Sequence, residues 1–299
     1  MIKKILKWVG IIMAGLLGLL VLAAITLYVV TEQKLNKVYE VPPSGLVIPS
    51  DSATIVRGKH LVDSFGLCAG CHKDNFGGEV FNEGPLIGTI SIANLTSGKG
   101  GVGSLFTGED WVRAIRHGVD IDVKTLIDMP SNAFYNLSDE DLVAIIAYLK
   151  TIPPVDHEMP KTSLGLLGRF YILQMPEPLP AQAIDHQASR PPAAKPGVSV
   201  EYGEYLALAC KGCHGPDLAG GTQPGEGMNL TPAGDLGHWT EADFLKAIRT
   251  GTTIDGKALN PDLMPWRMIG KMTDDELKAI WLYLQTVPPV EVTPQPPQS

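Results

Sequence analysis

The residues in this 299-residue chain with the clearest chemical potential form one short pattern that occurs twice. Each copy has two cysteines separated by two residues and followed at once by a histidine: Cys68, Cys71 and His72, then Cys210, Cys213 and His214. Cys-x-x-Cys-His is the attachment signature of a c-type haem. The thiols bond to the porphyrin, and the histidine is an axial ligand of the iron. The pattern therefore predicts two covalently attached haems.

The four cysteines of the chain all lie in these two motifs, so any alternative must use the same residues. The alternatives are two disulfides in an oxidising compartment, an all-cysteine zinc site and a thioredoxin-like dithiol. None of them explains a histidine directly after each pair, and no βαβ pattern accompanies the cysteines. Haem attachment is the favoured interpretation.

A haem held by one histidine needs a sixth ligand or leaves an open position. Met-Pro follows each haem motif, at Met129 and again at Met264, 135 residues later. A lone methionine more often fills a gap in a core, but thioether ligation is typical of haems that carry electrons. Because only these two methionines recur at equivalent positions, we predict that Met129 and Met264 are the axial ligands.

Histidine is the competing sixth ligand. Two of the five histidines outside the motifs align with other residue types in the second copy, and three lie in predicted linker or loop. We predict surface or structural roles for all five: His60, His117, His157, His186 and His238.

Other short motifs show that the chain is duplicated. Asn-Leu-Thr begins at Asn94 and at Asn229, and Pro-Pro-Val begins at Pro153 and at Pro288, both 135 residues apart. The haem motifs are 142 residues apart, so the first copy has a loop insertion of seven residues after its haem motif. We predict two tandem copies of one domain, with a role near the haem for the loop that contains Asn-Leu-Thr.

Helices must position these residues. Capping-box patterns precede a middle helix in each copy, and Gly118 and Gly251 are its predicted C-terminal caps. Arg116 and Arg249 near its end either neutralise a haem propionate or form a solvated helix end. A last amphipathic helix stops before each Pro-Pro pair. No stretch shows sustained strand alternation, so the predicted fold class is all-α.

The N-terminus predicts a membrane anchor. Three lysines precede an apolar run over residues 8–30, whose 23 residues would span about 35 Å as a helix. The positive-inside rule places the chain beyond residue 30 outside the cytoplasm, in the periplasm where one exists. A cleaved signal peptide is the alternative, although the apolar run continues well past Ala23-Ala24. All 32 acidic residues lie after the run, so the exported part repels nucleic acid and favours partners with basic faces.

The predicted organisation has six parts. They are a cytoplasmic tail with transmembrane anchor (1–30), a tether (31–50), a first domain (51–155), a Pro-rich linker (156–196), a second domain (197–290) and a disordered tail (291–299). Inside the linker, residues 164–175 are apolar but too short to span a bilayer. We expect them to form a helix packed across both domains rather than a second membrane contact.

The shared motifs resemble those of class I c-type cytochromes. More narrowly, Asn-Leu-Thr, Ile-Arg-x-Gly, Met-Pro and Leu-x-x-x-Pro-Pro-Val resemble the cytochrome subunits of membrane-bound alcohol and gluconate dehydrogenases, over roughly residues 51–290. The resemblance implies His/Met haems that pass electrons from a periplasmic dehydrogenase towards quinone or a terminal oxidase. That family usually has three haem domains and no such N-terminal anchor.

These features predict a membrane-tethered dihaem electron carrier rather than an enzyme. Its expected partners are redox proteins: a dehydrogenase, a quinol-oxidising complex or a terminal oxidase. A dihaem enzyme, such as a peroxidase or a small-anion-oxidising cytochrome, is the alternative, and would need an exchangeable site on one iron. A purely structural anchor protein is the third possibility.

Overall fold

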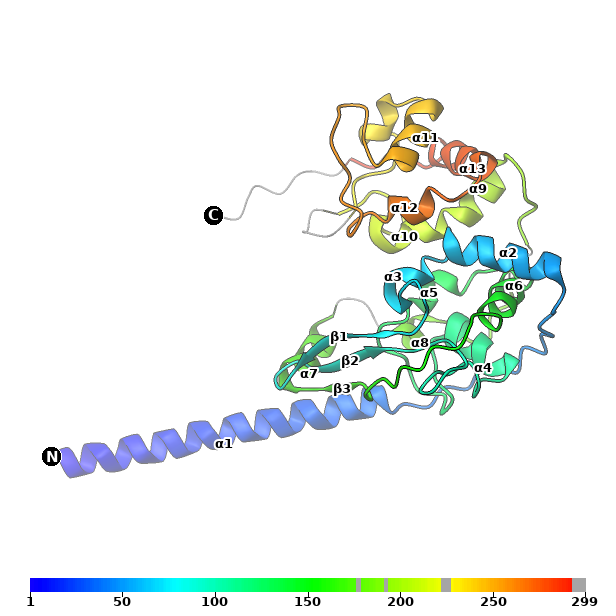
Figure 1. The fold of residues 1–299 in the computed structure, drawn as a ribbon. Coiled ribbons are helices and arrows are strands. Elements are labelled where there is room, and N and C mark those ends of the chain that lie inside the picture. Colours follow the sequence, from blue (N-terminus) through cyan, green and yellow to red (C-terminus); the bar gives the residue numbers. More distant parts are fainter. Residues whose placement is uncertain (176–178, 191–192, 222–226, 292–299) are drawn as a thin grey trace.

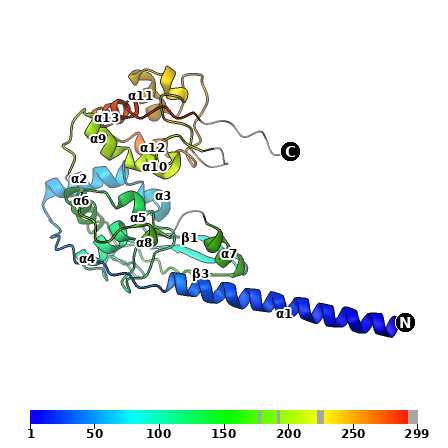
Figure 2. The ribbon, with the colours of Figure 1, turned by 180° about the vertical axis from the view of Figure 1, so that it is seen from behind.

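The computed structural model describes residues 1–175, 179–190, 193–221 and 227–291, and it is mainly helical, as predicted. Helix α1 (Ile2–Leu35) is long and apolar and projects away from two helical domains (Figures 1 and 2). The first domain lies beside the end of α1, and the second domain lies on the side of the first that faces away from α1. Beyond residue 291, the predicted disordered tail lies outside the described residues.

The two domains repeat the same order of helices, except that the second domain has an additional 3-10 helix before its middle helix. The first contains α2 (Ser52–Asp63), α3 (Cys68–His72), α4 (Gly108–Val112), the π-helical η1 (Arg113–His117), α5 (Ser131–Phe134) and α6 (Asp139–Leu149). The second contains α9 (Val200–Leu206), α10 (Leu208–His214), the 3-10 helix η2 (Asp235–His238), α11 (Glu241–Thr250), α12 (Trp266–Ile269) and α13 (Asp274–Leu284). The predicted capping boxes are present at Thr107 and Thr240.

In each domain the first helix crosses the last helix at a glycine. A Cβ added to Gly58 of α2 would lie 1.8 Å from the Ala144 carbonyl oxygen of α6. A Cβ added to Gly203 of α9 would lie 1.9 Å from the Ala279 carbonyl oxygen of α13. Only glycine permits such a close approach of two helix backbones. The equivalence of the two crossings supports the duplication inferred from the motif spacing.

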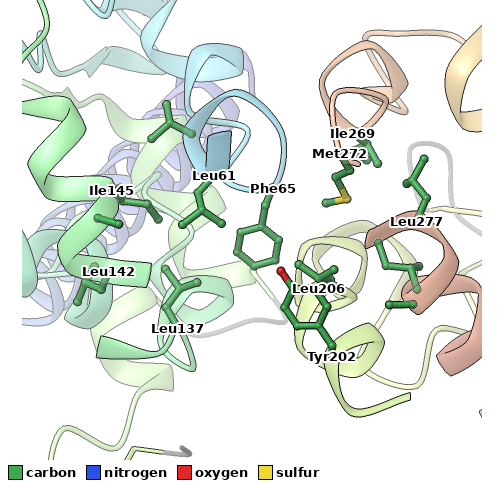
Figure 3. Packing of buried hydrophobic residues seen from close by; sticks show 14 of the residues in the cluster. Leu61, Phe65, Leu137, Leu142, Ile145, Tyr202, Leu206, Ile269, Met272 and Leu277 are labelled. Carbon is green, nitrogen blue, oxygen red and sulfur yellow. The ribbon is translucent and has the colours of Figure 1, made fainter. Parts of the chain in front are cut away.

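The cores of the two domains join into one apolar cluster. Figure 3 shows Phe65 of the first domain between Leu61 and the second-domain residues Tyr202 and Leu206. The Phe65 and Tyr205 rings stack with their centroids 6.0 Å apart. The two domains therefore pack directly against each other.

A small antiparallel sheet was not predicted from the sequence. Strands β1 (Glu79–Gly84) and β2 (Gly88–Ile92) form a hairpin between the first haem motif and Asn94, where the seven additional residues lie. Strand β3 (Ser163–Leu164) pairs with β2 from the linker. The sequence of β1 shows no alternation of apolar and polar residues, because the strand has a bulge and no residue of it is fully buried.

The segment predicted as a linker packs on the first domain. Besides β3 it contains α7 (Leu166–Gln174) and α8 (Pro180–Ala183). Helix α7 contacts α1, β2 and β3, and α8 contacts α5. The helix expected near residues 164–175 is therefore present, but it lies beside the anchor helix instead of across the two domains (Figure 1).

Candidate haem-attachment sites

The two Cys-x-x-Cys-His motifs form short helical segments, α3 and α10. No disulfide joins any two of the four cysteines in the structure. Cys71 and Cys213 are exposed, while burial raises the pKa of the Cys68 and Cys210 thiols to about 12. Each motif therefore presents one half-buried and one exposed thiol in a single short helix.

Both motif histidines are oriented by a backbone carbonyl. His72 Nδ1 donates to the Ala93 carbonyl oxygen at 2.8 Å, and His214 Nδ1 donates to the Met228 carbonyl oxygen at 2.6 Å. Burial lowers the pKa of each imidazole, which keeps it neutral. With Nδ1 protonated, the lone pair is on Nε2, the atom that binds iron. The paired thiols and the Nε2 donor fit a covalently attached haem.

A polar clasp holds the carbonyl that orients His72. The Asn94 side-chain amide donates to the Val155 carbonyl oxygen at 2.7 Å, and its amide oxygen accepts from the Thr96 backbone N–H at 2.9 Å. The Thr96 hydroxyl accepts from the Val155 N–H at 2.9 Å. Asn94 directly follows Ala93, so the clasp fixes the position of the Ala93 carbonyl.

The second domain repeats this clasp. Asn229 donates to the Val290 carbonyl oxygen at 2.8 Å, and the Thr231 N–H donates to Asn229 Oδ1 at 2.9 Å. Asn229 directly follows Met228, whose carbonyl orients His214. In each domain, side chains of Asn-Leu-Thr form hydrogen bonds with the backbone of the valine in Pro-Pro-Val. This contact explains why the distance between the two motifs along the sequence is the same in both domains. We term these contacts the Asn-Thr clasps.

We expect Asn94→Ala to raise the midpoint potential of the first haem and leave that of the second unchanged. Asn94 is 1% exposed, so its loss leaves buried partners unsatisfied at a cost of about 1–3 kcal/mol. A looser Ala93 carbonyl weakens the bond to His72 Nδ1, which makes the imidazole a poorer donor to iron. A two-component redox titration measures the change. Asn229→Ala is the matched control and should move only the other component, whereas equal shifts of both haems would contradict the assignment.

The two predicted methionine ligands occupy equivalent places. Met129 and Met264 are half-buried against the apolar cluster and directly precede the turns that lead into α5 and α12. These turns pack on the glycines that end the middle helices. A Cβ added to Gly118 (φ +64°) would lie 3.2 Å from Ser131 Cβ, and one added to Gly251 (φ +66°) would lie 2.2 Å from the Trp266 ring. The predicted glycine caps are therefore present, and they support the methionine turns.

The paired arginines form ion pairs with the last helix of their domain, and exposed Arg249 also fits the predicted solvated helix end. Buried Arg116 donates to Asp139 at 2.6 Å and to the Leu137 carbonyl oxygen at 2.8 Å. Arg249 pairs with Asp274 at 2.7 Å in the same manner. Both aspartates lie in the first turn of the last helix, so each arginine fixes the start of that helix.

The remaining histidines make structural contacts or are exposed. His60 binds Glu276 across the domain interface at 2.8 Å, and His117 Nδ1 lies 3.0 Å from His186 Nδ1. His157 Nδ1 donates to the Gly77 carbonyl oxygen at 2.9 Å, while His238 is exposed. These positions agree with the surface or structural roles predicted from the sequence.

Each haem motif lies against the other domain. Helix α10, which carries the second motif, contacts α5, the helix that follows Met129. Conversely, a Cβ added to Gly70 of the first motif would lie 3.3 Å from Met268 Cε of α12, the helix that follows Met264. The arrangement is reciprocal and brings both motifs to the domain interface.

Comparison with known families gives one match in each domain. The family described as cytochrome c matches residues 200–288, and the family described as cbb3-type cytochrome c oxidase subunit III matches residues 53–149. Both are consistent with the paired Cys-x-x-Cys motifs and two c-type haems.

Three relatives extend the comparison. The fructose dehydrogenase cytochrome subunit of Gluconobacter japonicus is 30% identical over 79% of this chain and 53% of its own length. The cytochrome c subunit of the quinone alcohol dehydrogenase of Gluconacetobacter polyoxogenes is 28% identical over 81% of this chain and 57% of its own length. A diheme cytochrome c-type protein of Cereibacter sphaeroides is 26% identical over 79% of this chain and 86% of its own length.

The chain thus spans little more than half the length of the two dehydrogenase subunits that it matches. The similarity to the dihaem protein covers most of both chains. The duplicated motifs, the Asn-Thr clasps and these matches lead to one conclusion. The chain is a cytochrome c electron carrier with two cytochrome c domains, distantly related to cytochrome subunits of dehydrogenases.

Proposed function

We propose that this chain is a membrane-anchored dihaem cytochrome that passes single electrons between redox proteins outside the cytoplasm. Each haem is bonded through one Cys-x-x-Cys pair, with axial ligands His72 and Met129 in the first domain and His214 and Met264 in the second. The observation that carries the proposal is the Nδ1–carbonyl bond at both histidines, because it leaves the Nε2 lone pair of each one available to an iron.

The bound haem supplies reversible one-electron chemistry, and the chain controls the environment in which that chemistry occurs. The Asn-Thr clasps hold the histidines, and the glycine-supported turns hold the methionines. The reciprocal contacts of α10 with α5 and of Gly70 with Met268 bring the two motifs to one interface. This arrangement supports electron exchange between the haems within one molecule.

The position of α1 supports an anchor. The helix runs without a break through Ala23-Ala24 to Leu35, and it is long and apolar enough to cross a membrane. Its last turns are fixed to the folded protein, since Thr31 is fully buried and Arg169 donates to its hydroxyl at 2.8 Å. We infer that the lysine-rich start lies in the cytoplasm and that both domains lie on the opposite side.

The relatives suggest the partners. Two of them are named as cytochrome subunits of fructose and alcohol dehydrogenases. We propose that a dehydrogenase donates electrons to this protein. A quinol-oxidising complex or a terminal oxidase is the other redox partner that we propose. The acidic surface favours docking faces rich in lysine and arginine.

The function is tested with full-length protein purified from membranes. We expect two covalently bound haems per chain by pyridine haemochrome assay, both low-spin by electron paramagnetic resonance, and retention in the membrane after a carbonate wash. Replacing Cys68 and Cys71 with serine should leave one haem, and the matched replacement of Cys210 and Cys213 should leave the other. A high-spin haem with peroxide turnover would instead identify a dihaem enzyme.

A further inference from the structure

Helix α7 presents its most apolar face to the outside. Its exposed positions follow one side of the helix and include Leu166, Leu167, Phe170 and Tyr171, which are 48%, 50%, 54% and 65% exposed. Its buried side instead contains Arg169. A surface helix normally buries its apolar side, so this reversal marks a surface that contacts something apolar.

The β1–β2 turn extends this surface. The Leu167 N–H donates to the Leu86 carbonyl oxygen at 2.9 Å, and the Gly165 N–H donates to the Ile87 carbonyl oxygen at 2.8 Å. The side chains of Leu86 and Ile87 are 60% and 39% exposed. We call the combined surface the apolar platform: Leu86, Ile87, Leu166, Leu167, Phe170 and Tyr171.

Arg169 fixes the platform to the end of the anchor helix. Its guanidinium donates to the Thr31 hydroxyl at 2.8 Å, pairs with Glu32 at 2.9 Å and lies 3.9 Å from the centre of the Tyr28 ring. Only 10% of the Arg169 side chain is exposed. Tyr28 and Thr31 lie where the apolar run ends, at the depth of the lipid headgroups in a spanning helix. The platform is therefore held at that depth.

We propose that the apolar platform inserts into the outer leaflet of the bilayer that α1 spans. This rests on the proposed anchor. Lipid is the favoured occupant because the platform is continuous with the exposed apolar surface of α1, and because aliphatic residues beside a tyrosine suit the membrane interface. Arg169 is the one charged residue of α7, and it pairs with Glu32 of α1. Insertion of α7 therefore places no unpaired charged side chain in the lipid.

The contact would fix the orientation of the molecule. A single helix alone allows the domains to swing about the tether. With the platform inserted, the first domain is held beside the end of the anchor helix, and the second domain packs on the opposite side of the first (Figures 1 and 2).

Spin labelling of the full-length holoprotein in phosphatidylcholine nanodiscs tests the proposal. The native thiols are bonded to haem, so one added cysteine is a unique labelling site. Labels go on the platform (Leu86→Cys, Phe170→Cys), on the anchor (Ile12→Cys) and on α9 of the second domain (Glu204→Cys, an exposed position). Power saturation measures how accessible each label is to oxygen and to a water-soluble nickel chelate, with nitrogen as the reference. An unchanged haem spectrum confirms that each variant is folded.

We expect the oxygen-to-nickel accessibility ratio to be several-fold higher at both platform labels than at Glu204→Cys, and highest at Ile12→Cys. Platform labels as open to nickel as Glu204→Cys, with Ile12→Cys immersed, would overturn the platform but leave the anchor intact. An Ile12→Cys label in water would overturn the anchor itself. Platform labels that become shielded only when a membrane extract is added would identify a protein partner in place of lipid.

Discussion

Met129→Ala should abolish the thioether charge-transfer band of one haem and lower its midpoint potential, while the other haem is unchanged. Thioether sulfur stabilises ferrous iron, and axial ligands move haem potentials over about 0.8 V. Loss of one methionine should therefore shift the potential by on the order of 0.1 V or more. The near-infrared band and a redox titration measure the two effects.

Met264→Ala is the matched variant and should affect only the second haem. Met175→Ala provides the negative control, because Met175 is also half-buried but belongs to the segment between the domains and has no counterpart in the other copy. Should both near-infrared signals survive either Met-Pro substitution, that methionine is not a ligand. The iron would then have another sixth ligand or an open position, and the enzyme alternative would gain weight.

The sequence was sufficient to predict the features that depend on repetition. The constant spacing identified Asn94 and its Pro-Pro-Val partner as parts of one domain, and the structure shows why both recur. The sequence could not show that the Ala93 and Met228 carbonyls orient the histidines, because a backbone carbonyl has no residue-type signature. The small sheet escaped prediction for a similar reason, since β3 pairs with β2 from a distant part of the chain.

The domain interface was hidden because the two copies differ there. Arg57 and His60 of α2 correspond to Tyr202 and Tyr205 of α9. Because the residue types differ, comparison of the two copies did not predict that these side chains contact each other. In the structure these four side chains meet two acids from the last helices. Tyr205 donates to Asp141 at 2.7 Å, and Arg57 binds the same carboxylate at 2.9 Å. Divergence between otherwise repeated helices was itself the available signal of an asymmetric contact.

Glu276 of the second domain contacts His60 and Arg57 of the first domain. It is 5% exposed, accepts from His60 at 2.8 Å, and lies 3.4 Å from Arg57 and 3.3 Å from the Tyr202 hydroxyl. Burial alone would raise the pKa of its carboxyl. The hydrogen bond from His60, the Thr273 N–H and the Arg57 charge outweigh burial and lower the pKa to about 2, from an ordinary value of 4.5.

We expect Glu276→Gln to lower the free energy of unfolding by about 3 kcal/mol at neutral pH, the equivalent of that pKa difference. Because the folded-state pKa is depressed, this stabilisation is fully present above pH 4.5 and is lost as the pH falls towards 2. The deficit of the variant should therefore shrink over that window. Glutamine can still accept from the Thr273 N–H in the capping box, so the substitution isolates the charge.

Urea unfolding in detergent micelles, followed by far-UV circular dichroism between pH 7 and pH 3, measures the deficit of Glu276→Gln. Asp63→Asn is the control, because Asp63 forms a surface pair with Lys59 within α2 and its loss should change stability by less than about 1 kcal/mol. An equal, pH-independent effect of the two substitutions would show that Glu276 does not hold the domains together by its charge. A larger deficit that vanishes in acid would show that one buried carboxylate couples the two haem domains.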